Sequence, residues 1–119
     1  MKVFIISSAS FYDRILPIKE YLESKNIEVI LPNTYDNPNL EKEVWEKGFK
    51  EHAKLEKELF KMSEEKIKMV DAVLCINFEK NNIDNYIGGA TFIEIYEAFK
   101  NNKKIYLIQH LLSKIITKN

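Results

Sequence analysis

The sequence has a single cysteine, no excess of either charge and no long apolar run, and each of these shortages argues against a class of protein. Cys75 cannot form an internal disulfide, and its position in an apolar stretch indicates a buried, unreactive thiol. Lys+Arg and Asp+Glu balance at 18 each, which argues against a partner that is a nucleic-acid polymer or an anionic membrane. No apolar stretch approaches the roughly 18 residues of a transmembrane helix, and the amino terminus lacks the apolar segment of a signal peptide. We therefore expect a cytoplasmic protein.

Glycine and proline are also scarce, with three residues of each, so the chain is not a flexible or low-complexity sequence. Apolar residues make up 45% of the 119 residues and charged residues 30%, which is an ordinary composition for a folded protein. The length fits one domain spanning residues 1–119.

Four short apolar runs rich in β-branched residues predict buried strands. They cover residues 2–6, 27–31, 71–77 and 104–109. Periodic apolar residues between them predict helices over 11–25, 41–69 and 90–102, and residues 110–119 predict a short helix or a frayed tail. In the 90–102 helix we expect an inward stripe of Phe92, Ile95, Tyr96 and Phe99. Gly48 weakens the long 41–69 helix, so we expect a kink or a break there, or an extension that packs on a partner subunit.

Strands that alternate with helices predict an α/β sandwich with a parallel sheet. We expect a small Rossmann-like or flavodoxin-like fold with about four strands in the order 2-1-3-4. Ligands bind such sheets beyond the carboxyl ends of the strands. The segments predicted at this edge are the serine turn at 7–10, the loop 32–40, the loop 77–89 and residues 109–110.

The serine turn allows two interpretations. Ser10 could cap the first helix, with Asp13 completing a capping box. Alternatively, the hydroxyls of Ser7, Ser8 and Ser10, together with free N–H groups at the helix start, could hold a phosphate or a sugar oxygen.

The segment NYIGGATFIE (85–94) raises a similar question. Thr91 and Glu94 have capping-box spacing, while Gly88 and Gly89 would let a ligand approach the helix start. Glu94 would also lie in the first helical turn, where the helix dipole favours an ionised carboxylate. Asp71, which opens the third strand, has the simpler interpretation of a cap on the preceding turn. His52 and His110 show no metal-ligand spacing, so no metal site and no cofactor are predicted.

The layout from KVFIISSAS to KKIYLI, and most of all the stretch DAVLCINFEKNNIDNYIGGATFIEIYEAF, resembles the nucleoside 2-deoxyribosyltransferase superfamily, which includes nucleoside and nucleotide N-glycoside hydrolases. The resemblance implies a nucleophilic Glu94 that forms a covalent glycosyl intermediate, as in a retaining glycosidase. It also implies a second acidic residue near the sugar, for which Glu65 has the matching position beside Glu64.

The remaining substrate-binding residues that we expect lie on the same segments. Phe11 or Tyr86 could stack on the base, and the others are Ser7, Ser8, Ser10, Asp71, Asn77, Asp84, Gly88, Gly89 and Thr91. The resemblance implies a nucleoside or nucleotide as the partner. Because members of this family are typically oligomers, it also implies a homo-oligomer, most simply a dimer.

Three functions remain open. The first is an N-glycosidase or deoxyribosyltransferase. The second is an inactive nucleotide-binding or small-ligand-binding protein, which is favoured by Gly88 at the position of a family aspartate and by the short segment after the fourth strand. The third is a structural domain in which the long helix serves dimerisation, with Trp45 or Phe49 exposed.

Overall fold

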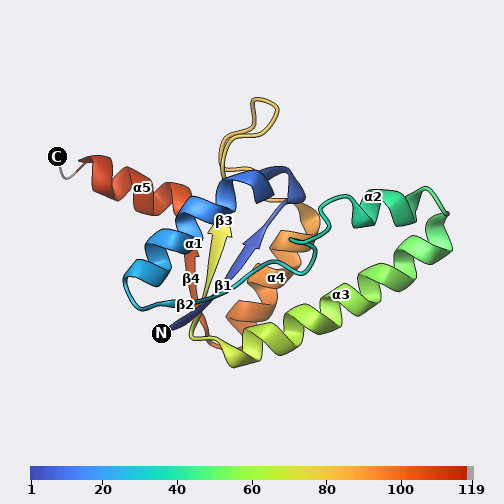
Figure 1. The fold of residues 1–119 in the computed structure, drawn as a ribbon, viewed down its shortest axis with the longest axis horizontal. Helices are drawn as coiled ribbons and strands as arrows, with labels where there is room; N and C mark the ends of the chain where they lie inside the picture. The colour runs from blue at the N-terminus through green and yellow to red at the C-terminus, as the bar shows by residue number, and fades with distance from the viewer. Residues whose placement is uncertain (118–119) are drawn as a thin grey trace.

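Four parallel strands form the centre of the molecule, which a computed structural model describes for the backbone of residues 1–117 and the side chains of residues 1–112. The strand order is β2-β1-β3-β4, which confirms the predicted α/β fold and its 2-1-3-4 sheet (Figure 1). The strands are β1 (Lys2–Ser7), β2 (Glu28–Ile30), β3 (Ala72–Ile76) and β4 (Lys104–Leu107). Because β1 and β3 are covered on both faces of the sheet, their sequences are continuous apolar runs and do not alternate between apolar and polar residues.

Helices cover both faces of the sheet, and each face has its own apolar core. On one face Val3, Ile5 and Leu74 pack against Phe11 and Ile15, which belong to the 3₁₀ helix η1 (Ala9–Arg14) and the helix α1 (Ile15–Ser24). On the other face Phe4, Ile6 and Val73 pack against Ile67 and Ala98. These last two residues belong to α3 (Phe49–Met69) and α4 (Gly89–Lys100). The alternation of β1 side chains between the two faces therefore ties all three layers together.

The first predicted helix begins as a 3₁₀ helix, so its start differs from the prediction. The prediction that Ser10 caps this helix is wrong, because Ser8 is the N-cap and its Oγ accepts a hydrogen bond from the Ser10 backbone N–H at 3.3 Å. The α1 helix follows without a side-chain cap, and Pro17 lies in its first turn, where a missing N–H group costs little.

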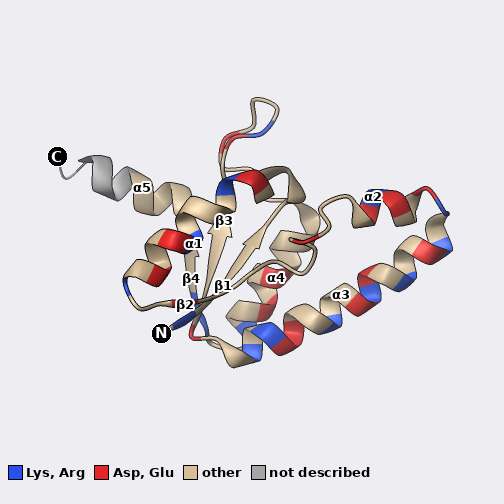
Figure 2. Cartoon of the chain, in the orientation of Figure 1, with Lys and Arg blue, Asp and Glu red and all other residues tan. Residues whose placement is uncertain are grey.

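The long 41–69 helix is broken at Gly48, as the sequence indicated. The break separates α2 (Leu40–Trp45) from α3, and Gly48 has φ 120° and ψ 166°, a backbone conformation that essentially only glycine adopts. The chain therefore folds back, and the two helices form an arm that extends from the sheet (Figure 1). Acidic and basic residues are interspersed along this arm (Figure 2).

Two other predictions change near the end of the chain. Residues 108–109 were predicted as strand but belong to α5 (Ile108–Thr117), so the predicted short helix forms and begins earlier than expected. Residues 118–119 of the predicted tail lie outside the described residues. Among residues 1–117, no helix combines the length and the apolar character needed to cross a bilayer.

The predicted inward stripe of α4 is wrong in three of its four residues. Phe92, Tyr96 and Phe99 are 64%, 56% and 69% exposed, and only Ile95 packs against the core. Ala98 and Thr91 are buried instead, and with Ile95 they form the face of α4 that packs against the sheet. The outer face of α4 is consequently aromatic.

The Gly48 turn gives a test of this architecture. Replacing Gly48 by alanine should destabilise the protein by about 1–3 kcal/mol, because the added Cβ makes the positive φ costly even though no atom lies within 4 Å of it. Gly89→Ala is the matched control, since Gly89 opens α4 without a positive φ and an added Cβ there also meets nothing within 4 Å. Urea unfolding measures both. Equal midpoints for Gly48→Ala and wild type would contradict the break.

Candidate active site

A cleft opens at the carboxyl end of β1, on the α3 and α4 side of the sheet. It is bounded by η1, by the loop after β2, by α2 and α3, and by the start of α4. Chain order and spatial order diverge on the two sides of β1, since β2 lies on one side and β3 on the other. Ligands of parallel α/β sheets bind at this kind of switch point.

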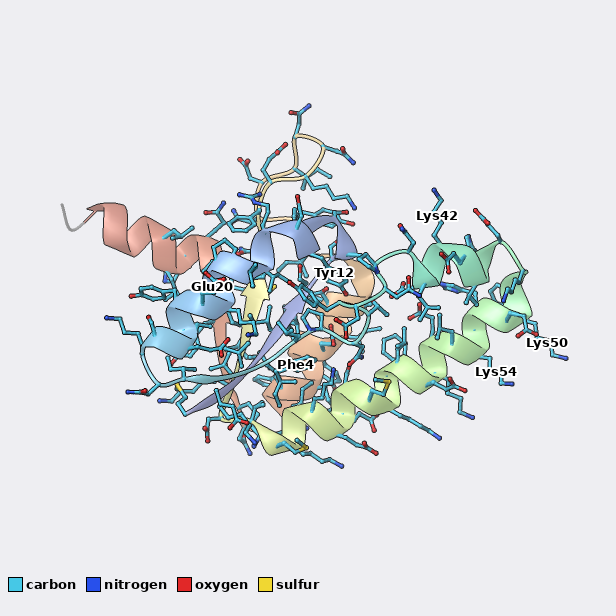
Figure 3. All side chains as sticks on the ribbon, viewed as in Figure 1. Phe4, Tyr12, Glu20, Lys42, Lys50 and Lys54 are labelled. Atoms are coloured by element: carbon cyan, nitrogen blue, oxygen red, sulfur yellow. The ribbon has the colours of Figure 1, made fainter. Side chains whose placement is uncertain are left out.

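The cleft has an inner recess and a wider outer part that share a wall. The recess has a volume of about 50 Å³ and contains Glu94, Ser63 and Asn33. The outer part has a volume of about 380 Å³ and is lined by Ser8, Ser10, Gly88, Gly89, Lys42 and Lys80. Both parts are lined by Ser7, Tyr12, Glu41, Ala90 and Thr91. Figure 3 labels Tyr12 and Lys42, which line the outer part from η1 and α2. The outer part alone has the size of a small-molecule site.

Glu94 is held in the recess by a chain of hydrogen bonds that joins three segments. The Ser63 hydroxyl on α3 donates to Glu94 Oε2 at 2.7 Å, and Asn33 Nδ2 donates to the Ser63 Oγ at 2.8 Å. Asn33 Nδ2 also donates to the Leu59 carbonyl oxygen at 2.9 Å, which fixes the amide against α3. The carboxylate is therefore oriented by tertiary contacts rather than by its own helix.

The capping-box interpretation of Thr91 and Glu94 is wrong. The N-cap of α4 is Gly88, which has no side chain to cap the helix, and Thr91 lies buried on the inner face. The first N–H groups of α4 thus lack a side-chain acceptor and lie beside the outer part of the cleft, next to Gly88 and Gly89. This leaves Glu94 free to interact across the recess.

The electrostatic surroundings of Glu94 work in both directions. Burial raises the pKa of Glu94 to about 7, and the neighbouring carboxylates Glu41 and Glu56 add to this rise. The hydrogen bond from Ser63 and the positive charge of Lys66 oppose it. Lys66 is itself held, because its Nζ donates to the Leu31 carbonyl oxygen at 3.1 Å and lies over the Phe4 ring. Near neutral pH the carboxyl group is thus present in both protonation states.

The hydroxyls of the serine turn make hydrogen bonds within the turn. Ser7 Oγ donates to the Ser8 carbonyl oxygen at 2.8 Å, and Ser8 Oγ donates to Ser10 Oγ at 3.3 Å. Ser10 is exposed and faces the same space as Lys42 and Lys80. Two lysines against the single carboxylate of Glu41, together with two hydroxyls and the uncapped start of α4, make this outer part suited to an anionic group.

Six of the predicted binding residues line the cleft, namely Ser7, Ser8, Ser10, Gly88, Gly89 and Thr91. Glu94 lies among them in the recess.

Three predicted binding residues have structural contacts elsewhere. Phe11 is buried in the core and makes edge contacts with Phe78 at 5.8 Å and Tyr86 at 6.3 Å between ring centroids. Asn77 is buried, donates to Asn85 Oδ1 at 3.2 Å and accepts from the Gln109 backbone N–H at 3.0 Å. Both aromatic rings that were expected to stack on a base are thus used to hold the loop after β3.

Asp71, Glu65 and Asp84 also lie away from the lining of the cleft. Asp71 Oδ2 accepts the Lys2 backbone N–H at 2.8 Å, so this carboxylate ties β3 to β1 at the opposite edge of the sheet. Glu65 is exposed on α3 and Asp84 is exposed in the 77–89 loop. The catalytic role expected for Glu65 and the binding roles expected for Asp71 and Asp84 stay predictions that the geometry does not favour.

Sequence reasoning missed the residues that hold Glu94. Ser63, Asn33 and Lys66 come from two segments that the sequence described only as a helix and a loop. Their one signal is that Ser63 interrupts the apolar stripe of α3 at a buried position, between Leu59 and Ile67.

Searches with the whole sequence give no support for a family. No family model matches the chain, and no curated protein matches it significantly.

Substituting Glu94 by glutamine tests the buried carboxyl group through stability. A carboxyl whose folded pKa is raised from 4.5 to about 7 contributes stability below pH 4.5, and this contribution is lost as the pH rises through 7. Glu94→Gln should therefore gain stability relative to wild type as the pH rises from 5 to 8, on the order of 1–3 kcal/mol. Thermal unfolding at both pH values measures the difference.

Glu65→Gln is the control, because Glu65 is exposed on the neighbouring helix. Its difference from wild type should be much smaller and should change little with pH. A Glu94→Gln variant with the same flat difference would show that the carboxyl group is not buried as described.

Proposed function

We propose that the protein cleaves the N-glycosidic bond of a nucleoside or nucleotide, with Glu94 as the nucleophile. The observation that carries this proposal is the hydrogen bond that orients Glu94 in a recess opening onto a hydroxyl-lined and lysine-lined cleft. The sequence resemblance to nucleoside 2-deoxyribosyltransferases and their hydrolase relatives supports the same chemistry. The proposal covers hydrolysis and transfer, which differ only in the final acceptor.

The reaction begins when a Glu94 carboxylate oxygen bonds to the anomeric carbon of the sugar. The bond between that carbon and the base nitrogen breaks, and its electron pair leaves with the base, which takes a proton from solvent. Water then attacks the anomeric carbon, the ester bond to Glu94 breaks, and the carboxylate is restored as the sugar leaves. The proton released by the attacking water returns to solvent. In transfer, a second base nitrogen takes the place of water.

Ser63 and Lys66 give this carboxylate its reactivity. Only the ionised form attacks, and burial alone would keep Glu94 protonated well above its ordinary pKa. The Ser63 hydroxyl and the Lys66 charge favour the ionised form while leaving one carboxylate oxygen without the serine bond. Because the desolvated carboxylate loses less solvation when it forms a bond, the recess favours the covalent step.

The outer part of the cleft supports a substrate with an anionic group. Lys42, Lys80 and the hydroxyls of Ser8 and Ser10 line a space that adjoins the recess through Ser7 and Thr91. A phosphate there would place the sugar toward Glu94, because the recess of about 50 Å³ admits only the leading edge of a ring. This arrangement favours a nucleotide over an unphosphorylated nucleoside.

One observation favours a second candidate, a binding protein of the same fold without catalysis. Gly88 lies in the cleft at the position where transferases of the resembled family carry an aspartate, and a glycine supplies no carboxylate to assist the leaving base. Such a protein would bind nucleotides in the outer part and leave them intact.

Base release from deoxynucleosides and deoxynucleotides tests the proposal. Liquid chromatography should show release by wild-type protein, faster with the phosphorylated substrates. Glu94→Gln should lower the rate at least about 1,000-fold, since the amide cannot form the covalent intermediate. Glu65→Gln is the matched control, because Glu65 is exposed outside the lining of the cleft, and it should keep a rate near that of wild type.

The two candidates give different outcomes in that experiment. Base release that persists in the Glu94→Gln variant would refute the role of Glu94 as the nucleophile. Nucleotide binding in calorimetry without any base release would favour the binding protein. If the protein shows no nucleotide binding and no base release, both candidates are excluded.

We propose further that the chain forms a homodimer through the outer face of α4. Phe92, Tyr96 and Phe99 are each more than half exposed, and these three aromatic side chains lie along one side of a single helix. Phe99→Glu should shift the sedimentation of the protein from dimer to monomer, whereas Leu16→Glu, at an exposed position on α1 across the sheet, should not. A monomeric wild-type protein at micromolar concentration would contradict the dimer.

A further inference from the structure

Three metal-ligating side chains meet on the arm formed by α2 and α3. Glu41 comes from α2, and His52 and Glu56 come from α3. One ligand atom from each of the three lies within 4.8 Å of the other two, and all three residues are half-buried. Both carboxylates also line the recess that contains Glu94.

Local structure explains why these side chains converge. His52 and Glu56 are one helical turn apart, so they project from the same face of α3. The turn at Gly48 folds α2 back along α3 and brings Glu41 to that face. The Trp45 ring packs against the His52 ring, with centroids 4.1 Å apart, and restricts its orientation.

The spacing suits a small divalent cation. His52 Nε2 lies 3.3 Å from Glu56 Oε1, a separation longer than a good charge-assisted hydrogen bond. Nitrogen and oxygen donors bound at about 2.0–2.2 Å to a tetrahedral zinc ion lie about 3.3 Å apart. One imidazole and two carboxylates are a donor set that transition-metal ions accept.

The charges of the cluster also favour a cation. Glu41 and Glu56 each place a carboxylate oxygen within 4.8 Å of the other. Two carboxylates held this close repel each other unless a proton or a cation lies between them. Independently, Asn33 Oδ1 is buried in the wall of the same recess and accepts no hydrogen bond among the described residues. A polar ligand in this recess could donate to it.

We propose that Glu41, His52 and Glu56 bind a divalent transition-metal ion, for which Zn²⁺ is the best fit. Three protein ligands leave at least one coordination position open to water or to a ligand in the cleft. An ordinary ion pair between His52 and Glu56 would account for two of these side chains but not for the approach of Glu41. The inference does not rest on the proposed glycosidic reaction, because Glu94 is not one of the ligands.

The single tryptophan gives a direct readout of binding. Trp45 is the chain's one tryptophan and contacts His52, so Co²⁺ bound at this site should quench its fluorescence. We expect saturable quenching by Co²⁺, reversal by added Zn²⁺, and one Zn²⁺ per chain in calorimetry. Mg²⁺ should bind much more weakly, since it prefers an octahedral oxygen shell.

Variants locate the ion. His52→Ala and Glu56→Gln should each weaken Zn²⁺ binding at least about tenfold, since each removes or neutralises a ligand. His110→Ala is the matched control, because His110 is the only other histidine and is exposed on α5, and it should leave the affinity unchanged. Because His52 and Glu56 are only half-buried, we expect both variants to fold, and circular dichroism tests whether they do.

The proposal fails if wild-type protein binds no Zn²⁺ below millimolar concentration. It also fails if His52→Ala and Glu56→Gln bind as wild type does, or if His110→Ala loses the ion. Base release is not used as a readout, so a failure here leaves the proposed reaction unaffected.

Discussion

The hydrogen bond from Ser63 to Glu94 is the interaction on which the candidate site depends. It joins the two helices on one face of the sheet, α3 and α4, and it turns a carboxylate away from its own helix start into a recess. Asn33 extends the contact to the loop after β2, so three segments far apart in the chain are fixed by one polar network. A buried network of this kind is stable only when its members find partners, which restricts the positions of all three segments.

The arm formed by α2 and α3 has a second role in this arrangement. The Gly48 turn places Glu41 and Glu56 in the wall of the recess, where their charges add to the larger effect of burial in raising the pKa of Glu94. Lys66, on the same helix as Glu56, opposes them. Burial is thus the main cause of the raised pKa of Glu94, and side chains of α2 and α3 adjust it. Reactivity at this site would be tuned by the packing of the arm.

The strands and their order were predictable because buried parallel strands leave an unambiguous apolar pattern, as KVFII and DAVLCIN do. The break at Gly48 was predictable as well, since a glycine interrupted an otherwise regular helix. The inward face of α4 was not. Its aromatic residues point outward and Ala98 points inward with Ile95, because the packing of the helix on the sheet, which no local pattern encodes, decides which face is buried.

Part of the candidate site followed from the sequence in the same way. Ser7, Ser8, Gly88 and Gly89 could be placed in the cleft because the carboxyl ends of parallel strands share one edge. Ser63 and Asn33 could not, because their contacts join residues 30 and 31 positions apart and depend on how α3 crosses the sheet. Phe11 and Tyr86 were assigned to a base, but aromatic burial in the core competes with ligand stacking, and the core contact prevailed.

The most direct test of this account is the titration of the Glu94 carboxyl group followed by ¹³C NMR on glutamate-labelled protein. The signal that disappears in Glu94→Gln identifies the residue. We expect its midpoint near pH 7, where burial, Ser63 and Lys66 balance. A midpoint at the ordinary glutamate value of about 4.3 would mean that this carboxylate is exposed to water, and the account of the recess would be wrong.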